Sequence, residues 1–231
     1  MTAMERRAFL ALSAVAAPTL TLGCSPSRNA NATVGDDPAA RKASATAGND
    51  RAAPSPAKRK LLLVFFSRAG ENYFNGGRKL LDVGNTQVVA EIIRGSLGCD
   101  LFQIQPVEPY PHDYEATVQR NAREQAENAR PSIVNLPPSL AAYDSILIGS
   151  PIWNVRVPRI ILTFVEKFDF AGKTIYPFTT HAMSGLGHAI EEYTSACRGA
   201  TIREGLAIRG EKADQSRPDV ETWLRRVELL A

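Results

Sequence analysis

The sequence predicts an α/β fold of the doubly wound class, in which helices cover both faces of a parallel sheet. Two observations support this class. Short apolar runs of strand-forming residues alternate along residues 59–231 with segments whose apolar residues recur at helical spacing. The runs are apolar throughout, which is typical of parallel strands buried on both faces. Strict alternation of the two kinds of segment predicts consecutive βα units in one sheet.

Five segments are predicted as strands because each is a short and mainly apolar run. The first of them reads LLLVFF without interruption, so we expect it near the centre of the sheet. The predicted strands are 61–66, 100–105, 143–148, 174–179 and 202–208.

A predicted helix follows each strand or its connecting loop. The first begins at Asn85 or Thr86, either of which can cap it, and carries valines and isoleucines on one face. The last begins at Pro218, because proline is favoured in the first turn, and Trp223 is expected on its core face. The other helices are expected over 114–126, with a thin apolar stripe of Tyr114, Val118, Ala122 and Ala126, and over 157–168 and 187–197.

The loop between the first strand and the first helix predicts an anion site. It is rich in glycine and hydroxyl side chains, and it leads into a helix N-terminus. The free N–H groups of a first helical turn and the helix dipole both favour a bound phosphate. Within this loop, Asn75-Gly76 lies between ENYF and RKLLDV and is a strong signal for a hairpin turn.

The residues on either side of this hairpin resemble a known motif. Ser67, Arg68 and Ala69, joined to Gly84, Asn85 and Thr86, are similar to the hydroxyl-x-x-Gly-Asn-Thr phosphate loop of flavodoxin-like proteins, which bind FMN. Residues 70–83 interrupt the motif, and we interpret them as an inserted hairpin beside the site. We expect it to bring Tyr73 and Phe74 near the site, where they could line a substrate slot or fold over the flavin. An alternative alignment uses 67–72 directly, but no helix then follows the loop. The resemblance implies the flavodoxin strand order 2-1-3-4-5, with FMN at the C-terminal ends of strands 1, 3 and 4.

Two further loops resemble the segments that hold the isoalloxazine ring in this family. After the third strand, Trp153 is expected to stack on the flavin, although it could instead cap the next helix. After the fourth strand, glycines allow close approach of the backbone to a ligand, and no aromatic residue is present, so one flavin face is left open. The resemblance assigns cofactor contacts to Pro151, Ile152, Trp153 and Asn154 in the former loop and to Thr180, His181, Ser184, Gly185 and Gly187 in the latter. His181 is also the candidate proton donor.

Two other nucleotide-binding motifs are excluded because each lacks one required glycine. A P-loop at Gly172-Lys173-Thr174 would need a glycine at Lys167, and a dinucleotide fingerprint at Gly185-Leu186-Gly187 would need one at Ile190. No cysteine and histidine set has the spacing of a metal site. The cofactor predicted is therefore FMN and neither FAD nor NAD, with no metal.

The first 58 residues have a different composition. Arg6-Arg7 precede an apolar run over 9–22 that is too short to span a membrane and that ends in Leu22-Gly23-Cys24. This resembles a lipoprotein signal, with a twin-arginine motif at its start; a generic signal peptide is the alternative. Residues 25–58 are polar and are predicted to be a disordered linker. We therefore expect an exported protein, lipid-anchored at Cys24 on the outer face of a bacterial membrane or in the periplasm.

The net charge says little about which partners the protein binds. The whole of the +3 comes from the first 58 residues: residues 1–24 hold two Arg and one Glu, and residues 25–58 hold five basic and three acidic residues. The domain from 59 to 231 is therefore near neutral, and no basic stripe predicts nucleic-acid binding. Three functions stay open. We favour an FMN-dependent oxidoreductase of a quinone-like or other flat acceptor, with a protein-docking electron carrier as the alternative and a flavin-free binding domain as the third; neither donor nor acceptor is named by the sequence.

Overall fold

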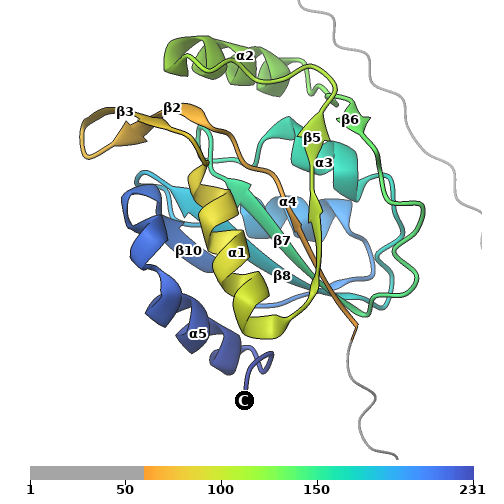
Figure 1. Cartoon of the computed structure of the whole chain (residues 1–231). Coiled ribbons are helices and arrows are strands. Elements are labelled where there is room, and N and C mark those ends of the chain that lie inside the picture. The colour runs from red at the N-terminus through yellow and green to blue at the C-terminus, as the bar shows by residue number, and fades with distance from the viewer. Residues whose placement is uncertain (1–59) are drawn as a thin grey trace, which may run out of the picture. The chain divides into compact units, whose positions relative to one another are not determined.

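The computed structural model describes residues 60–231, so the predicted signal and linker lie outside the described residues. A parallel sheet forms the centre of this domain, in the order β10-β8-β7-β1-β4 (Figure 1). In chain order this is the predicted arrangement 2-1-3-4-5, so the doubly wound fold is confirmed. The strands are β1 (Leu61–Phe65), β4 (Asp100–Gln103), β7 (Ser145–Pro151), β8 (Thr174–His181) and β10 (Leu206–Arg209).

Two predicted strands are wrong in detail. The segment 202–208 is not continuous: β9 (Thr201–Ile202) and β10 both pair with β8, and the charged pair Arg203-Glu204 followed by Gly205 separates them. The segment 100–105 also divides after β4, because β5 (Gln105–Pro106) leaves the main sheet and pairs with β6 (Ile133–Val134). Conversely, β7 extends to Pro151, since its last residues pair with β8.

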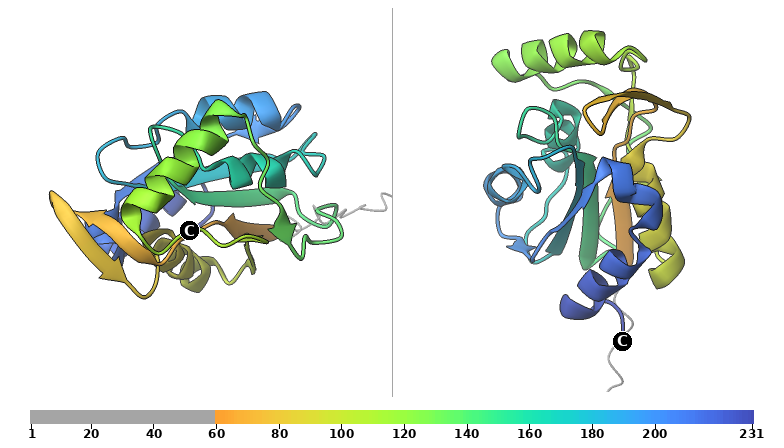
Figure 2. Two further views of the ribbon diagram at one scale, coloured as in Figure 1. Left: turned by 90° about the horizontal axis from the view of Figure 1, so that it is seen from above. Right: turned by 90° about the vertical axis from the view of Figure 1, so that its left-hand side faces the viewer.

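Two helices cover each face of the sheet (Figure 2). On one face α1 (Asn85–Leu97) and α5 (Arg217–Arg226) pack against Leu63 and Phe65 of β1. On the other face α3 (Arg159–Val165) and α4 (Ala189–Ala196) pack against Leu62 and Val64. Alternate residues of β1 thus enter opposite cores, as expected for a central strand. A 3-10 helix, η1 (Gly210–Gln215), joins β10 to α5.

The helix α2 (Tyr114–Ala126) lies above the C-terminal ends of the strands, outside the two helical layers (Figures 1 and 2). Its predicted apolar stripe is wrong, because Val118 is 43% exposed and the buried side chains are Thr117, Asn121 and Glu124. The reason is that α2 packs through hydrogen bonds: Tyr110 Oη donates to Glu124 at 2.8 Å, and Arg120 Nε donates to the same carboxylate at 2.8 Å.

Residues 70–81 form the hairpin, with β2 (Gly70–Phe74) antiparallel to β3 (Gly77–Leu81). Its turn residues Asn75 and Gly76 have φ values of 48° and 87°, as a type I′ turn requires. In the described part of the chain, no helix is long and apolar enough to cross a membrane, and Cys99 and Cys197 are both free thiols.

Candidate functional site

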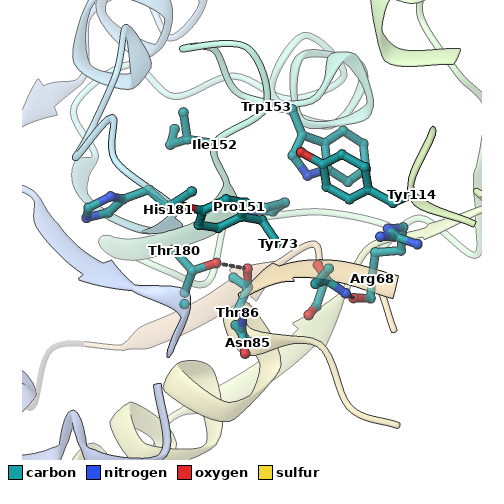
Figure 3. Close-up of a pocket in the computed structure, with 14 residues that line it drawn as sticks. Arg68, Tyr73, Asn85, Thr86, Tyr114, Pro151, Ile152, Trp153, Thr180 and His181 are labelled. Carbon is teal, nitrogen blue, oxygen red and sulfur yellow. Dashed lines mark hydrogen bonds between the residues drawn. The ribbon is translucent and has the colours of Figure 1, made fainter. Parts of the chain in front are cut away.

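A cleft opens where β1, β7 and β8 end, and three loops, the hairpin and α2 all contribute to it (Figure 3). This is the edge where parallel α/β sheets bind ligands. The cleft is lined by Ser67, Arg68, Asn72, Tyr73, Asn85, Thr86, Tyr114, Pro151, Ile152, Trp153, Thr180, His181, Ala182 and Gly210.

The structure brings the two halves of the interrupted phosphate motif together. The backbone N–H of Gln87 donates to Ser67 Oγ at 3.1 Å, so the end of β1 contacts the first turn of α1. Gly84 lies between them, and a Cβ at this position would be 2.3 Å from Ser67 Oγ and 2.4 Å from the carbonyl oxygen of Arg68. Only glycine fits there. The hairpin is therefore inserted between Ala69 and Gly84 without separating the two parts of the motif in space.

The N-terminus of α1 suits an anion. Its N-cap, Gly84, has no side chain and makes no capping hydrogen bond, and the next two residues, Asn85 and Thr86, line the cleft. First-turn N–H groups have no partner within a helix, and the dipole adds positive potential there. These residues fit a phosphate group.

A buried pair of hydroxyls joins the first loop to the third. Thr86 Oγ1 and Thr180 Oγ1 share a hydrogen bond of 2.7 Å, and both residues are almost fully buried (Figure 3). The pair fixes the start of α1 against the end of β8. The Thr86 hydroxyl is thus held at the floor of the cleft.

Arg68 has a different role from the one its position in the motif suggests. Its guanidinium donates to the carbonyl oxygens of Pro111 at 2.8 Å and His112 at 3.1 Å, and to that of Glu71. Burial lowers the pKa of the guanidinium, with Glu71 opposing this effect. The side chain joins the hairpin base to the loop before α2, because its terminal N–H groups donate to backbone carbonyl oxygens of the protein itself.

Trp153 lies at the other end of the cleft from the helix N-terminus (Figure 3). Its ring makes edge contacts with Phe66 at a centroid distance of 5.7 Å and with Tyr110 at 5.1 Å. Its carbonyl oxygen accepts a hydrogen bond from Gln125 of α2 at 3.1 Å. The N-cap of α3 is Pro158, so Trp153 does not cap that helix. These T-shaped contacts and the backbone hydrogen bond fix the position of the ring in the lining of the cleft.

His181 borders the cleft opposite the hairpin base. Its Nδ1 atom is buried and has no hydrogen-bond partner among the described residues. Burial lowers the pKa of the imidazole, and the nearby Arg209 lowers it further, with Glu211 opposing. The side chain is consequently neutral at pH 7 and can carry a proton on one ring nitrogen while accepting on the other.

The residues predicted for the site are placed in two groups. Those that line the cleft are Ser67, Arg68, Asn85, Thr86, Pro151, Ile152, Trp153, Thr180 and His181. Those that do not line it are Ala69, Gly84, Asn154, Ser184, Gly185 and Gly187. Among the latter, Gly84 and Gly187 shape the loops, since a Cβ on Gly187 would be 2.3 Å from the carbonyl oxygen of Val155. Asn154 donates to Gln125 at 3.0 Å.

The site predicted from the sequence omits five lining residues, which are Asn72, Tyr73, Tyr114, Ala182 and Gly210. The sequence predicts that the hairpin brings Tyr73 and Phe74 near the site, and the structure places Tyr73 in the lining of the cleft but not Phe74. Tyr114 and Gly210 come from α2 and η1, and no local pattern signals their position. In residues 60–231 no cluster of three His, Cys, Asp or Glu side chains could hold a metal ion.

The fold and the cleft together define a doubly wound α/β protein with a helix N-terminus at one end of its site and an aromatic ring at the other. The sequence profile of the flavodoxin family matches residues 80–227, so the chain belongs to the flavodoxin family. Together with the residues of the cleft, this membership supports FMN as the cofactor.

Solved structures agree with this family. A Bacteroides uniformis protein assigned to the flavoproteins is 30% identical, with 73% of this chain and 99% of that chain covered and a TM-score of 0.58. A Bacteroides eggerthii counterpart is 27% identical, with 73% and 98% covered and a TM-score of 0.59. The Lactobacillus acidophilus flavoprotein in complex with FMN is 20% identical, with 68% and 97% covered and a TM-score of 0.49. No curated protein matches the chain.

Proposed function

We propose that this protein is an FMN-dependent oxidoreductase that transfers electrons to a quinone-like or other flat small acceptor. The observation that carries the proposal is a single cleft that joins the N-terminus of α1 to an aromatic-lined opening, with Thr86 and Asn85 at one end and Trp153 at the other. When bound there, FMN supplies the redox chemistry, because its ring can take up and release an electron pair.

The protein's own residues would bind and orient the cofactor. First-turn N–H groups of α1 would donate to the phosphate, and charge-assisted hydrogen bonds of this kind contribute about 1.5–3 kcal/mol each. Trp153 would stack on the ring system, which adds roughly 0.5–1.5 kcal/mol beyond burial. Phe66 and Tyr110, which make T-shaped contacts with the Trp153 ring, would support it in this role.

His181 is the proposed proton donor. It lines the cleft, and burial and Arg209 lower its pKa, which favours the neutral imidazole. A neutral imidazole can donate its N–H proton to an acceptor oxygen and regain a proton from solvent. Because Nδ1 is buried, Nε2 is the ring nitrogen that would make this exchange.

An electron carrier is the second candidate, and one observation favours it. A carrier benefits from covering both flavin faces, and the hairpin brings Tyr73 to the cleft from the side that the loop after β8 leaves without an aromatic ring. In that case a partner protein, and no small molecule, would receive the electrons.

Stopped-flow mixing separates the two functions. FMN-loaded protein is mixed without oxygen with NADH or NADPH, and then with a benzoquinone. Loss of the oxidised-flavin absorbance on adding nucleotide, and its return with quinone, is the result expected of the oxidoreductase. If neither nucleotide reduces the flavin, and the chemically reduced protein passes electrons only to a protein acceptor, the oxidoreductase proposal is wrong.

A further inference from the structure

We propose that Tyr73 is the residue that determines which acceptors reach the flavin, by limiting the cleft to small, flat and uncharged molecules. This inference rests on the proposed oxidoreductase function and adds a specificity determinant to it. It concerns the β2–β3 hairpin, which the phosphate motif does not require.

Tyr73 belongs to a continuous wall made of Tyr73, Arg78 and Tyr114, called here the hairpin wall. Tyr73 and Arg78 are directly paired across the hairpin, so their side chains share one face of the ribbon. The Arg78 guanidinium lies 3.5 Å from the centre of the Tyr114 ring and donates to Glu115 at 2.9 Å. Tyr73 and Tyr114 both line the cleft, and Arg78 lies next to each of them.

The hairpin is attached to the domain on both sides of the cleft. On the α2 side, the Glu71 N–H donates to the His112 carbonyl oxygen at 2.8 Å, and the Tyr114 N–H donates to the Glu71 carboxylate at 3.3 Å. On the η1 side, the turn N–H of Asn75 donates to Glu211 at 3.2 Å, and the Glu211 side chain is only 5% exposed. These hydrogen bonds at both ends fix the position of the hairpin relative to the cleft.

The ring of Tyr73 extends from this wall over Pro151 toward His181 (Figure 3). Tyr73 is half-buried and lines the same cleft as the residues proposed to hold FMN. An acceptor that approaches the flavin from the hairpin side therefore has to pass the Tyr73 ring.

The charge in the wall is paired, because the Arg78 guanidinium donates to the Glu115 carboxylate at 2.9 Å. The two tyrosine rings of the wall favour a flat and uncharged acceptor. The acceptor class that fits is a neutral quinone with one or two unsubstituted rings. Such a quinone takes up two electrons and two protons to give the hydroquinone, while reduced FMN returns to the oxidised form.

The test measures how fast different acceptors reoxidise the reduced protein, and light replaces the nucleotide as the source of electrons. FMN-loaded protein is reduced by light without oxygen and mixed in a stopped-flow instrument with 1,4-benzoquinone, with 2,6-di-tert-butyl-1,4-benzoquinone and with a cytochrome c. The readout is the ratio of the second-order rate constants for the small and the bulky quinone, normalised to free reduced FMN. This normalisation removes the difference in quinone potential.

We expect a ratio of at least tenfold for the natural chain, retained in Tyr73→Phe and falling stepwise through Tyr73→Leu to about one in Tyr73→Ala. The control is Phe74→Ala, because Phe74 is the next residue of β2, does not line the cleft and has its ring beside the Lys79 ammonium group. This control should keep the natural ratio.

Two results would overturn the inference. Equal ratios in Tyr73→Ala and the natural chain would show that the ring does not select, and loss of FMN from both Tyr73→Leu and Tyr73→Ala would show that it binds the cofactor instead. Failure of the proposed function looks different: no quinone would reoxidise the natural protein, and only cytochrome c would.

Discussion

Gly84 shows at the scale of one residue how the phosphate loop depends on space. Gly84→Ala places a methyl group 2.3 Å from Ser67 Oγ, so the end of β1 and the start of α1 have to separate. We expect FMN binding to weaken at least tenfold, with a smaller loss for riboflavin, which has no phosphate. Titration followed by flavin fluorescence measures both ligands.

Gly95→Ala is the matched control for this change. Gly95 lies in the same helix, and a methyl group there would meet no other atom within 4 Å, so alanine should stabilise the helix by about 0.5–1 kcal/mol. Equal losses of FMN and riboflavin affinity in Gly84→Ala would contradict the assignment of the phosphate to this loop.

Trp153 gives a spectroscopic prediction because the chain has only two tryptophans. Trp223 is fully buried in the core on the α5 side of the sheet, does not line the cleft, and donates from its indole to the Glu204 carbonyl oxygen at 3.0 Å. We expect FMN to quench the tryptophan fluorescence of the natural protein and to leave that of Trp153→Phe nearly unchanged. Full quenching in the variant would place the stacking partner elsewhere.

His181 predicts a pH dependence of stability. Burial and Arg209 lower its pKa in the folded protein below the usual 6.5, so the unfolded chain binds the proton more readily. Stability should therefore fall as the pH is lowered from 6.5 through the folded pKa, and His181→Asn should flatten this fall. Urea midpoints at pH 7.5 and pH 5.5 measure the difference. An identical pH response in both proteins would show that His181 does not contribute.

At the scale of elements, the apolar runs are sufficient to predict the five main strands but not all of their ends. LLLVF forms β1 because burial on both faces leaves no position for a polar residue. The break at 203–205 is not visible in the sequence, because a charged pair beside an apolar segment does not by itself say where pairing with β8 stops. Tyr114 and Gly210 are not predictable for a related reason. They enter the cleft only through the packing of α2 and η1, which depends on contacts distant in sequence.

The polar packing of α2 carries its own prediction. Glu124→Ala would leave the Tyr110 hydroxyl and the Arg120 guanidinium without their shared carboxylate, and the side chains of Arg120 and Glu124 are only 11% and 10% exposed. Arg120 keeps its hydrogen bonds to the carbonyl oxygens of Glu108 and Pro109, but the Tyr110 hydroxyl stays buried without a partner, so we expect a loss of about 1–3 kcal/mol in the free energy of unfolding. Urea denaturation measures it, with the exposed Glu127→Ala as the control. A loss below about 0.5 kcal/mol on the same scale would mean that water replaces the carboxylate.

At the scale of the whole molecule, the cleft is assembled from residues 67 to 210. The cofactor can therefore bind only after most of the domain has folded. This requirement agrees with the twin arginines at Arg6-Arg7, since the twin-arginine route carries folded proteins. Residues 1–59 lie outside the described structure, so the argument for export rests on the sequence of the signal alone.

We propose on this basis that the mature protein begins at a lipid-modified Cys24 and is exported with FMN already bound. Mass spectrometry of the mature N-terminus should show a diacyl or triacyl cysteine, and Cys24→Ala should leave the protein without the lipid and in the soluble fraction. Replacing Arg6-Arg7 with two lysines should retain FMN-loaded protein inside the cell, because the charge is kept while the arginine pair is lost. An unmodified N-terminus at any residue other than Cys24 would refute lipidation, and normal export of the lysine variant would refute the twin-arginine route.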